Sequence, residues 1–342
     1  MSTSENNLST LDYDAPFYEL TNGNGAVVKV IPFGATVTSL KIPTKNGDLI
    51  DVVLGFDSVE GYEKSFQLDG SPYIGTTVGR YAGRINEGKF ELNGKTYQLA
   101  INNGPNSLHG GIENFSKKTW KVEAVTTGKN PSITLSYSSA ANEENYPGEL
   151  TVSLTYTLSE ENELILDYKA TTTEDTIINL THHGYFNLDG HQSDVSNQDL
   201  IVYAQKVLET REDCIPTGKI LDVADTVFDY RTAKKCPKSI DNTFVVENND
   251  AVKATLFSSL TNIKMDVYTD QPGVHIYVGG NCGPDLKGKE NASYHALSGI
   301  CFETQNFPDA PNHPHFPSAV LKKGEVYTQK TTYKFQSLLS AF

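Results

Sequence analysis

A single carboxylate at the end of an apolar run is the first feature of this chain that could do chemistry. Glu303 follows the strand-like segment 299–302 and stands directly before a loop rich in proline and asparagine at 306–312. A carboxylate held at the rim of a sheet and partly screened from water can act as a general base. A solvated glutamate at a strand end would look the same in sequence, so the interpretation depends on partners elsewhere.

Three histidines are candidate partners. His182 and His183 follow an apolar run at 177–180, and adjacent residues of a strand point to opposite faces. We therefore expect one imidazole to face the core and the other a cleft, where it can exchange a proton near neutral pH. The same alternation argues against a metal shared by the pair. His109 precedes two glycines, which indicates a loop, and a lone loop histidine is more often incidental.

Polar side chains that could hold a ligand occur in two further segments. Arg80 and Arg84 lie among glycines at 79–84, where the backbone can approach a ligand and forked donors can bind hydroxyls or carboxylates. Asp241 lies in the polar segment 239–243, for which we expect an Asx turn before an apolar strand. Each segment alone is a weak signal.

Charge and composition restrict the class of partner. The chain has 342 residues, a formal net charge of −14 and a pI of about 5.0, which argues against nucleic acid and anionic membranes as partners and fits a neutral small molecule. No apolar run approaches the ~20 residues of a membrane span. Residues 1–7 lack the features of a signal peptide, so we expect a cytoplasmic protein. Its four cysteines have no CxxC spacing, which predicts reduced thiols rather than disulfides or zinc.

The elements that must position these residues are strands. Residues 151–158 alternate between apolar and polar side chains, and Asn93-Gly94 joins two short runs as a hairpin turn would. Residues 57–66, with Ser58 as a possible cap, are the one short candidate helix. Further strands are predicted at 26–31, 36–42, 50–56, 133–137, 164–170, 177–180, 200–203, 263–268, 274–278 and 326–335.

No linker, fixed repeat or alternation of strands and helices interrupts this pattern. We therefore expect an all-β fold, one large antiparallel sandwich over residues 15–342, preceded by a flexible polar tail at 1–14. Function is expected in the long loops of such a sandwich.

Together these segments resemble the aldose 1-epimerase, or galactose mutarotase, family. Four runs carry the resemblance: VGRYAGRI at 78–85, NSLHGG at 106–111, HHGYFNL at 182–188 and ETQNFPDAPN at 303–312. They occur in the order and spacing of the family, and the likeness extends from about residue 18 to residue 335. Several long motifs in one order are a far more specific signal than any one of them.

The resemblance implies an antiparallel β-supersandwich with an open cleft that needs neither a metal nor an organic cofactor. It implies that Glu303 is the general base and His183 the general acid. It also implies that Arg84, His109 and Asp241 bind the sugar. The expected ligand is an aldose, and the expected assembly is a monomer or a homodimer.

Two positions differ from family members that act on galactose and glucose. Gly83 stands where some relatives have an asparagine, and His275 stands where some have a glutamine. We expect His275 to bind the substrate in place of that amide, and both changes put the preferred sugar in question. Tyrosines and Trp120 are candidate stacking faces for the sugar, although most are expected in the core.

Three other functions remain open on the sequence. A non-catalytic carbohydrate-binding sandwich would share the fold but would not need an acid and a base together. A hexose-6-phosphate 1-epimerase should have more basic residues near the cleft than Arg80 and Arg84. A glycosidase could pair Glu303 with Asp241, but it would leave the histidines unexplained.

Overall fold

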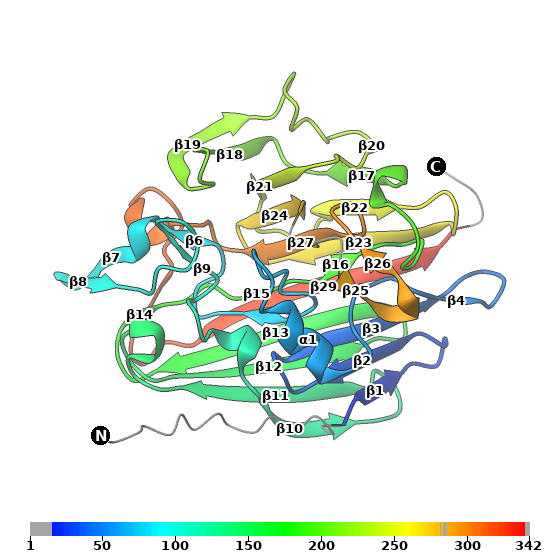
Figure 1. The fold of residues 1–342 in the computed structure, drawn as a ribbon, viewed down its shortest axis with the longest axis horizontal. Coiled ribbons are helices and arrows are strands. Elements are labelled where there is room, and N and C mark those ends of the chain that lie inside the picture. Colours follow the sequence, from blue (N-terminus) through cyan, green and yellow to red (C-terminus); the bar gives the residue numbers. More distant parts are fainter. Residues whose placement is uncertain (1–15, 281, 283–285, 339–342) are drawn as a thin grey trace.

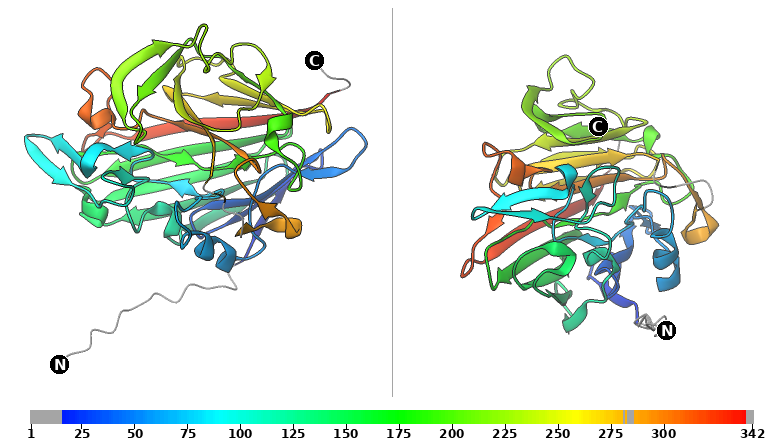
Figure 2. Two further views of the ribbon diagram at one scale, coloured as in Figure 1. Left: turned by 45° about the horizontal axis from the view of Figure 1, so that its top comes forward. Right: turned by 60° about the vertical axis from the view of Figure 1, so that its left-hand side comes forward.

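The computed structural model describes residues 16–280, 282 and 286–338 of the chain. The predicted tail at 1–14 lies outside these residues. The fold is all-β, as the sequence predicted, and every pair of named strands in the described residues is antiparallel. Figure 1 shows the arrangement, and Figure 2 gives two further sides of it.

Three sheets make up the sandwich. The largest has nine strands in the spatial order β10 (Lys121–Thr126), β11 (Ser132–Ser139), β12 (Leu150–Leu158), β13 (Glu163–Thr172), β29 (Tyr327–Ser337), β23 (Ile263–Thr269), β22 (Ala254–Phe257), β17 (Asp199–Val202) and β20 (Lys234–Lys235). The second has the order β16 (Tyr185–Phe186), β27 (Ile300–Gln305), β24 (Gly273–Val278), β21 (Ile240–Val245), β18 (Lys206–Thr210) and β19 (Pro216–Asp222). The third has the order β1 (Tyr18–Thr21), β2 (Val27–Ile31), β3 (Thr36–Pro43) and β4 (Leu49–Asp51).

Short elements connect the sheets. Five pairs of strands form small ribbons: β5 (Thr77–Val78) with β15 (Thr181–His182), β6 (Arg84–Ile85) with β9 (Ser107–Leu108), β7 (Lys89–Leu92) with β8 (Lys95–Gln98), β14 (Thr176–Ile177) with β28 (Val320–Leu321), and β25 (Leu286–Lys287) with β26 (Ser293–Tyr294). The helical elements are α1 (Val59–Ser65) and the single 3₁₀ turns Asn86–Gly88, Phe115–Lys117, Glu143–Asn145, Val195–Asn197, Lys289–Asn291 and Ala310–Asn312. No helix within the described part of the chain is long and apolar enough to span a membrane.

The main core lies where the sheets face one another. Alternation along β12 turns Val152, Leu154 and Tyr156 inward, and each is fully buried. They share one apolar cluster with Val28 of the four-stranded sheet and Ile276 of the six-stranded sheet. Burial of this apolar area is the main force that holds the layers together, at roughly 25 cal/mol per Å². The extent of a single domain over 15–342 stays a prediction.

Local turn chemistry agrees with the sequence. Asn93 and Gly94 have φ values of 52° and 76°, as a two-residue hairpin turn requires. Ser58 caps α1 by accepting a hydrogen bond from the Gly61 N–H. The prediction of a strand at 50–56 was too long, because β4 ends at Asp51 and beyond it Val53 makes only an isolated bridge to Phe186.

Candidate active site

The centre of the six-stranded sheet carries a row of polar side chains. Thr243 of β21 lies directly opposite His275 of β24, and His275 lies directly opposite Glu303 of β27. Because successive side chains of a strand alternate between faces, this face of the sheet also receives Asp241. The opposite face turns Ile276 and its apolar neighbours into the core. One sheet therefore contributes both a packed face and a polar site.

Three loop or ribbon residues approach this row from the opposite side. Arg84 begins β6, His109 follows β9, and His183 follows β15. All six residues predicted for the site line a single pocket. Its lining consists of Gly83, Arg84, Leu108, His109, His183, Thr210, Cys214, Pro216, Asp241, Thr243, His275, Tyr277, Glu303, Gln305 and Pro308.

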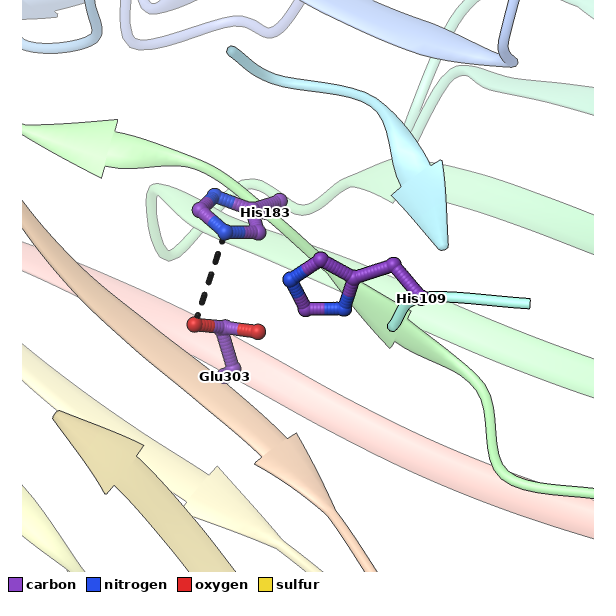
Figure 3. Close-up of side chains that lie close together, drawn as sticks. All are labelled: His109, His183 and Glu303. Carbon is purple, nitrogen blue, oxygen red and sulfur yellow. Dashed lines mark ion pairs between the residues drawn. The ribbon is translucent and has the colours of Figure 1, made fainter. Parts of the chain in front are cut away.

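Glu303 and His183 form the centre of the pocket. His183 Nε2 lies 3.6 Å from Glu303 Oε1, and the two side chains are 6% and 3% exposed (Figure 3). The other oxygen, Glu303 Oε2, is buried and has no hydrogen-bond partner among the described residues. Burial lowers the pKa of His183, while the negative charge of Glu303 opposes that shift. A carboxylate with a free oxygen beside a titratable imidazole is suited to move protons on a bound ligand.

His109 is held as a neutral donor. Its Nδ1 accepts a hydrogen bond from the Gly83 N–H at 3.2 Å, so the ring proton of the neutral form sits on Nε2. In Figure 3 this outer nitrogen points toward His183 and Glu303. Burial lowers the pKa of His109 well below its usual value, and the charge of His183 adds to the shift. A neutral imidazole N–H can donate to a hydroxyl or ring oxygen.

Backbone geometry explains the glycine that follows. His109 has a φ of 51°, and a Cβ on Gly110 would lie 2.0 Å from the Gly79 carbonyl oxygen. Only glycine allows the two loops to approach so closely. The resulting contact places His109 over the pocket.

His109, His183 and Glu303 also lie close enough to suggest a metal site. Their possible ligand atoms are all within 4.8 Å of one another. A histidine that binds a metal usually donates its second ring N–H to a neighbouring acceptor. His109 does the reverse, because its Nδ1 accepts from the Gly83 N–H. The group therefore fits an oxygen of a polar ligand better than a cation.

His182 turns away from the pocket, as alternation predicted. It is 2% exposed and lies between the rings of Tyr156 and Tyr333, with centroid separations of 6.2 and 6.1 Å. Neither ring nitrogen has a hydrogen-bond partner among the described residues. His182 is thus a core residue, and His183 is the member of the pair that faces the pocket.

Asp241 lies within strand β21 and not in the Asx turn that its sequence suggested. Pairing with β24, in which Asp241 lies opposite Tyr277, overrides the local turn preference of the polar segment. Asp241 Oδ2 lies 3.5 Å from Arg84 Nη2, and Oδ1 lies 2.7 Å from His275 Nε2. Burial raises the pKa of Asp241, but the hydrogen bond from His275 and the charges of His275 and Arg84 outweigh it and hold that pKa below its usual range.

Two residues considered from sequence lie outside the pocket. Arg80 is 2% exposed and donates to Ser139 and to the Pro147 carbonyl, so it supports loops and does not meet a ligand. Trp120 is 1% exposed, and its Nε1–H donates to the Phe115 carbonyl within the core. Trp120 is therefore not a stacking face for a sugar.

Sequence reasoning also missed several pocket residues. Thr243, Tyr277 and Gln305 each lie two positions beyond a predicted site residue, so strand alternation could have found them. Gln305 Oε1 is buried without a hydrogen-bond partner in the described part of the chain. Cys214 enters the pocket from a loop, and nothing in the sequence indicated its position.

Comparisons with known proteins identify the family of the chain. The family model described as aldose 1-epimerase matches residues 16–334. The galactose mutarotase of Bos taurus is 41% identical over 90% of both chains, and that of Homo sapiens is 39% identical over 94% of this chain and 97% of its own. A solved aldose epimerase homologue from C. elegans superposes with a TM-score of 0.87 at 33% identity, covering 95% of this chain and 99% of its own. The chain therefore belongs to the aldose 1-epimerase family.

Proposed function

We propose that the protein is an isomerase that interconverts the α and β anomers of aldohexoses such as galactose and glucose. The observation that carries this proposal is the pairing of Glu303 with His183, 3.6 Å apart in a pocket that also holds His109, Arg84 and Asp241. Anomer exchange needs one group that takes a proton from the C1 hydroxyl and another that gives a proton to the ring oxygen.

In this proposal Glu303 acts as the base and His183 as the acid. Glu303 removes the proton from the C1 hydroxyl, the bond between C1 and the ring oxygen breaks, and that oxygen receives the proton of His183. The free aldehyde then rotates about C1–C2. Closure on the other face returns the ring-oxygen proton to His183 and the Glu303 proton to the C1 oxygen. General acid and base groups typically contribute ~10²–10⁴-fold each.

The remaining side chains bind and orient the sugar. The neutral Nε2–H of His109 is directed at the reacting centre, and Arg84 with Asp241 offers donors and an ionised acceptor for hydroxyls. Gln305 Oε1 and Glu303 Oε2 lack partners among the described residues. Because a buried polar atom without a partner costs roughly 1–3 kcal/mol, sugar hydroxyls at these atoms would add to affinity.

The pocket gives less support to the other functions. Among its described lining residues Arg84 is the only lysine or arginine, and it is already paired with Asp241, so a phosphate would find little free positive charge. A glycosidase would need one protonated carboxyl group. Its second carboxyl group would act ionised, as Asp241 can, but such a mechanism gives His109 and His183 no role in the pocket.

Polarimetry tests the proposal directly. We expect the protein to accelerate the change in optical rotation of freshly dissolved α-D-galactose and α-D-glucose, and to act more weakly on glucose 6-phosphate. A rate equal to that of buffer alone, with sugar binding retained, would instead favour a non-catalytic carbohydrate-binding protein. A cytoplasmic location and a monomeric or dimeric state stay predictions.

A further inference from the structure

Both ring nitrogens of His275 are already occupied by protein atoms. Nδ1 lies 2.8 Å from Thr243 Oγ1, and Nε2 lies 2.7 Å from Asp241 Oδ1. The side chain is 12% exposed. A sugar hydroxyl could bind to this ring only by displacing Thr243 or Asp241. The alignment of His275 with a glutamine suggested a direct contact with the sugar. In the structure both ring nitrogens instead contact protein atoms.

We propose that His275 is a positioning residue, which Thr243 holds so that it fixes Asp241 for the sugar, and that it does not itself bind a hydroxyl. This inference rests on the proposed function, because it assumes that Asp241 binds the substrate. The contacts form one continuous line from Thr243 through His275 and Asp241 to Arg84. Beyond Arg84, its Nε donates to Asn103 Oδ1 at 3.0 Å, which anchors the far end.

The register of the sheet makes this line rigid. Thr243 and Asp241 are two residues apart on β21, so they project from the same face, and His275 of the next strand lies directly opposite Thr243. The ring therefore bridges Thr243 and Asp241, which lie on the same strand. Its orientation is set by strand pairing and does not require a ligand.

Proton donors and acceptors along the line fit both charge states of His275. The ionised carboxylate of Asp241 can only accept, so Nε2 keeps its proton throughout. The hydroxyl of Thr243 can donate to Nδ1 of a neutral ring or accept from Nδ1–H of a charged one. His275 can thus gain or lose a proton without moving.

Several groups act on the charge of this ring. They are Asp241 from β21, Glu303 from β27, Arg84 from β6, and His109 and His183 from the two loops above the sheet. Burial lowers the pKa of His275, but the hydrogen bond to Asp241 and the charges of Asp241 and Glu303 outweigh it, so that the pKa is raised. The geometry and the charges together favour a cation between two carboxylates.

Loss of that cation should weaken the hold on Asp241. As the pH rises through the raised pKa of His275, Asp241 loses the positive charge of its partner and keeps only a hydrogen bond from a neutral N–H to its ionised carboxylate. Sugar affinity should fall accordingly, so KM should rise with pH. The turnover number has its own dependence on pH, because His183 must be protonated to act as the acid.

Three variants test the role. His275→Ala removes the support, and we expect KM to rise about tenfold while kcat falls less than about threefold, since a hydrogen bond to a charged group is lost. His275→Gln keeps an N–H for Asp241 without a titratable group, so it should recover most of the affinity and abolish the dependence of KM on pH. Thr243→Val removes the acceptor for Nδ1–H and should shift the rise of KM to lower pH.

A measurement without substrate separates this inference from the proposed function. The His275 ring can be followed by ¹⁵N NMR and assigned by its loss in His275→Gln. We expect its pKa to fall in Asp241→Asn and in Thr243→Val. An unchanged pKa in both variants would overturn the inference, even if the protein proves active. If polarimetry shows no catalysis, galactose affinity by NMR replaces KM. A fall in kcat of a hundredfold in His275→Gln, with KM unchanged, would place His275 in the chemistry instead.

Discussion

His182 is a buried imidazole that the fold can hold only in its neutral form. It is 2% exposed, lies between two tyrosine rings, and has no hydrogen-bond partner on either ring nitrogen among the described residues. Burial, with a smaller contribution from the charge of His183, lowers its pKa from 6.5 to about 3. Replacing His182 by methionine, a flexible apolar side chain of similar size, should therefore change how the stability of the protein depends on pH.

The size of the effect follows from the difference between the two pKa values. In the unfolded chain the imidazole takes up a proton below pH 6.5, whereas in the folded protein it does so only near pH 3. The contribution of His182 to stability is therefore complete above pH 6.5 and is lost as the pH falls from 6.5 toward 3. Each pH unit in that window costs ~1.4 kcal/mol, so the loss between pH 8 and pH 5 is about 2 kcal/mol.

Urea unfolding at pH 8 and pH 5 measures this loss. Trp120, the only tryptophan of the sequence, is buried in the core and reports unfolding by fluorescence. At each pH, the unfolding free energy of the unaltered protein is subtracted from that of His182→Met. This difference should be about 2 kcal/mol higher at pH 5 than at pH 8. The same substitution at His295, whose side chain is 50% exposed, should show a much smaller change. An equal difference at both pH values for His182→Met would refute the reasoning.

Four further predictions concern catalysis. Glu303→Gln keeps the shape of the base but cannot accept a proton, so turnover should fall at least about a hundredfold without unfolding; a variant that keeps a tenth of the activity contradicts the assignment. His183→Ala should reduce turnover far more than His182→Ala, because only His183 faces the pocket, and the reverse order would mean that the pair is misassigned. EDTA should leave activity unchanged, since His109 is oriented as a donor, and a loss that a divalent metal restores would show a metal site. Gly83 has a φ of +80°, and the Cβ of Gly83→Asn would lie 3.1 Å from Pro308. This variant should alter the ratio of the kcat/KM values for galactose and glucose. An unchanged ratio would show that position 83 does not set specificity.

The four runs that carry the family resemblance named residues that the fold brings together. Four runs of the sequence contain Arg84, His109, His183 and Glu303, and all of these residues line one pocket. The alternating pattern at 151–158 likewise predicted the inward face of β12 correctly. In both cases each informative pattern lies within one short stretch of the chain.

Features set by distant pairing could not be predicted. Asp241 was expected in a turn because aspartate and asparagine favour turns, yet it pairs with Tyr277 of β24 and so lies within the sheet. Glu303 was placed at a strand end, whereas β27 continues for two more residues to Gln305. The tautomer of His109 depends on the Gly83 N–H, which is 26 positions away. Such contacts depend on how distant segments of the chain pair, and the sequence alone does not show which segments pair.

The division of the site between strands and loops has a chemical reason. In the proposed mechanism the base acts on the C1 hydroxyl and the acid on the ring oxygen, so the two groups reach the hemiacetal from different directions. Glu303 and Asp241 project from adjoining parts of a sheet whose strand pairing fixes them, whereas His183 and His109 approach from loops on the other side. The sequence led us to expect function in the long loops, with Glu303 at the end of a strand. The structure indicates instead that the sheet sets the position of the carboxylates and that the loops bring the imidazoles to them, so that His183 Nε2 lies 3.6 Å from Glu303 Oε1.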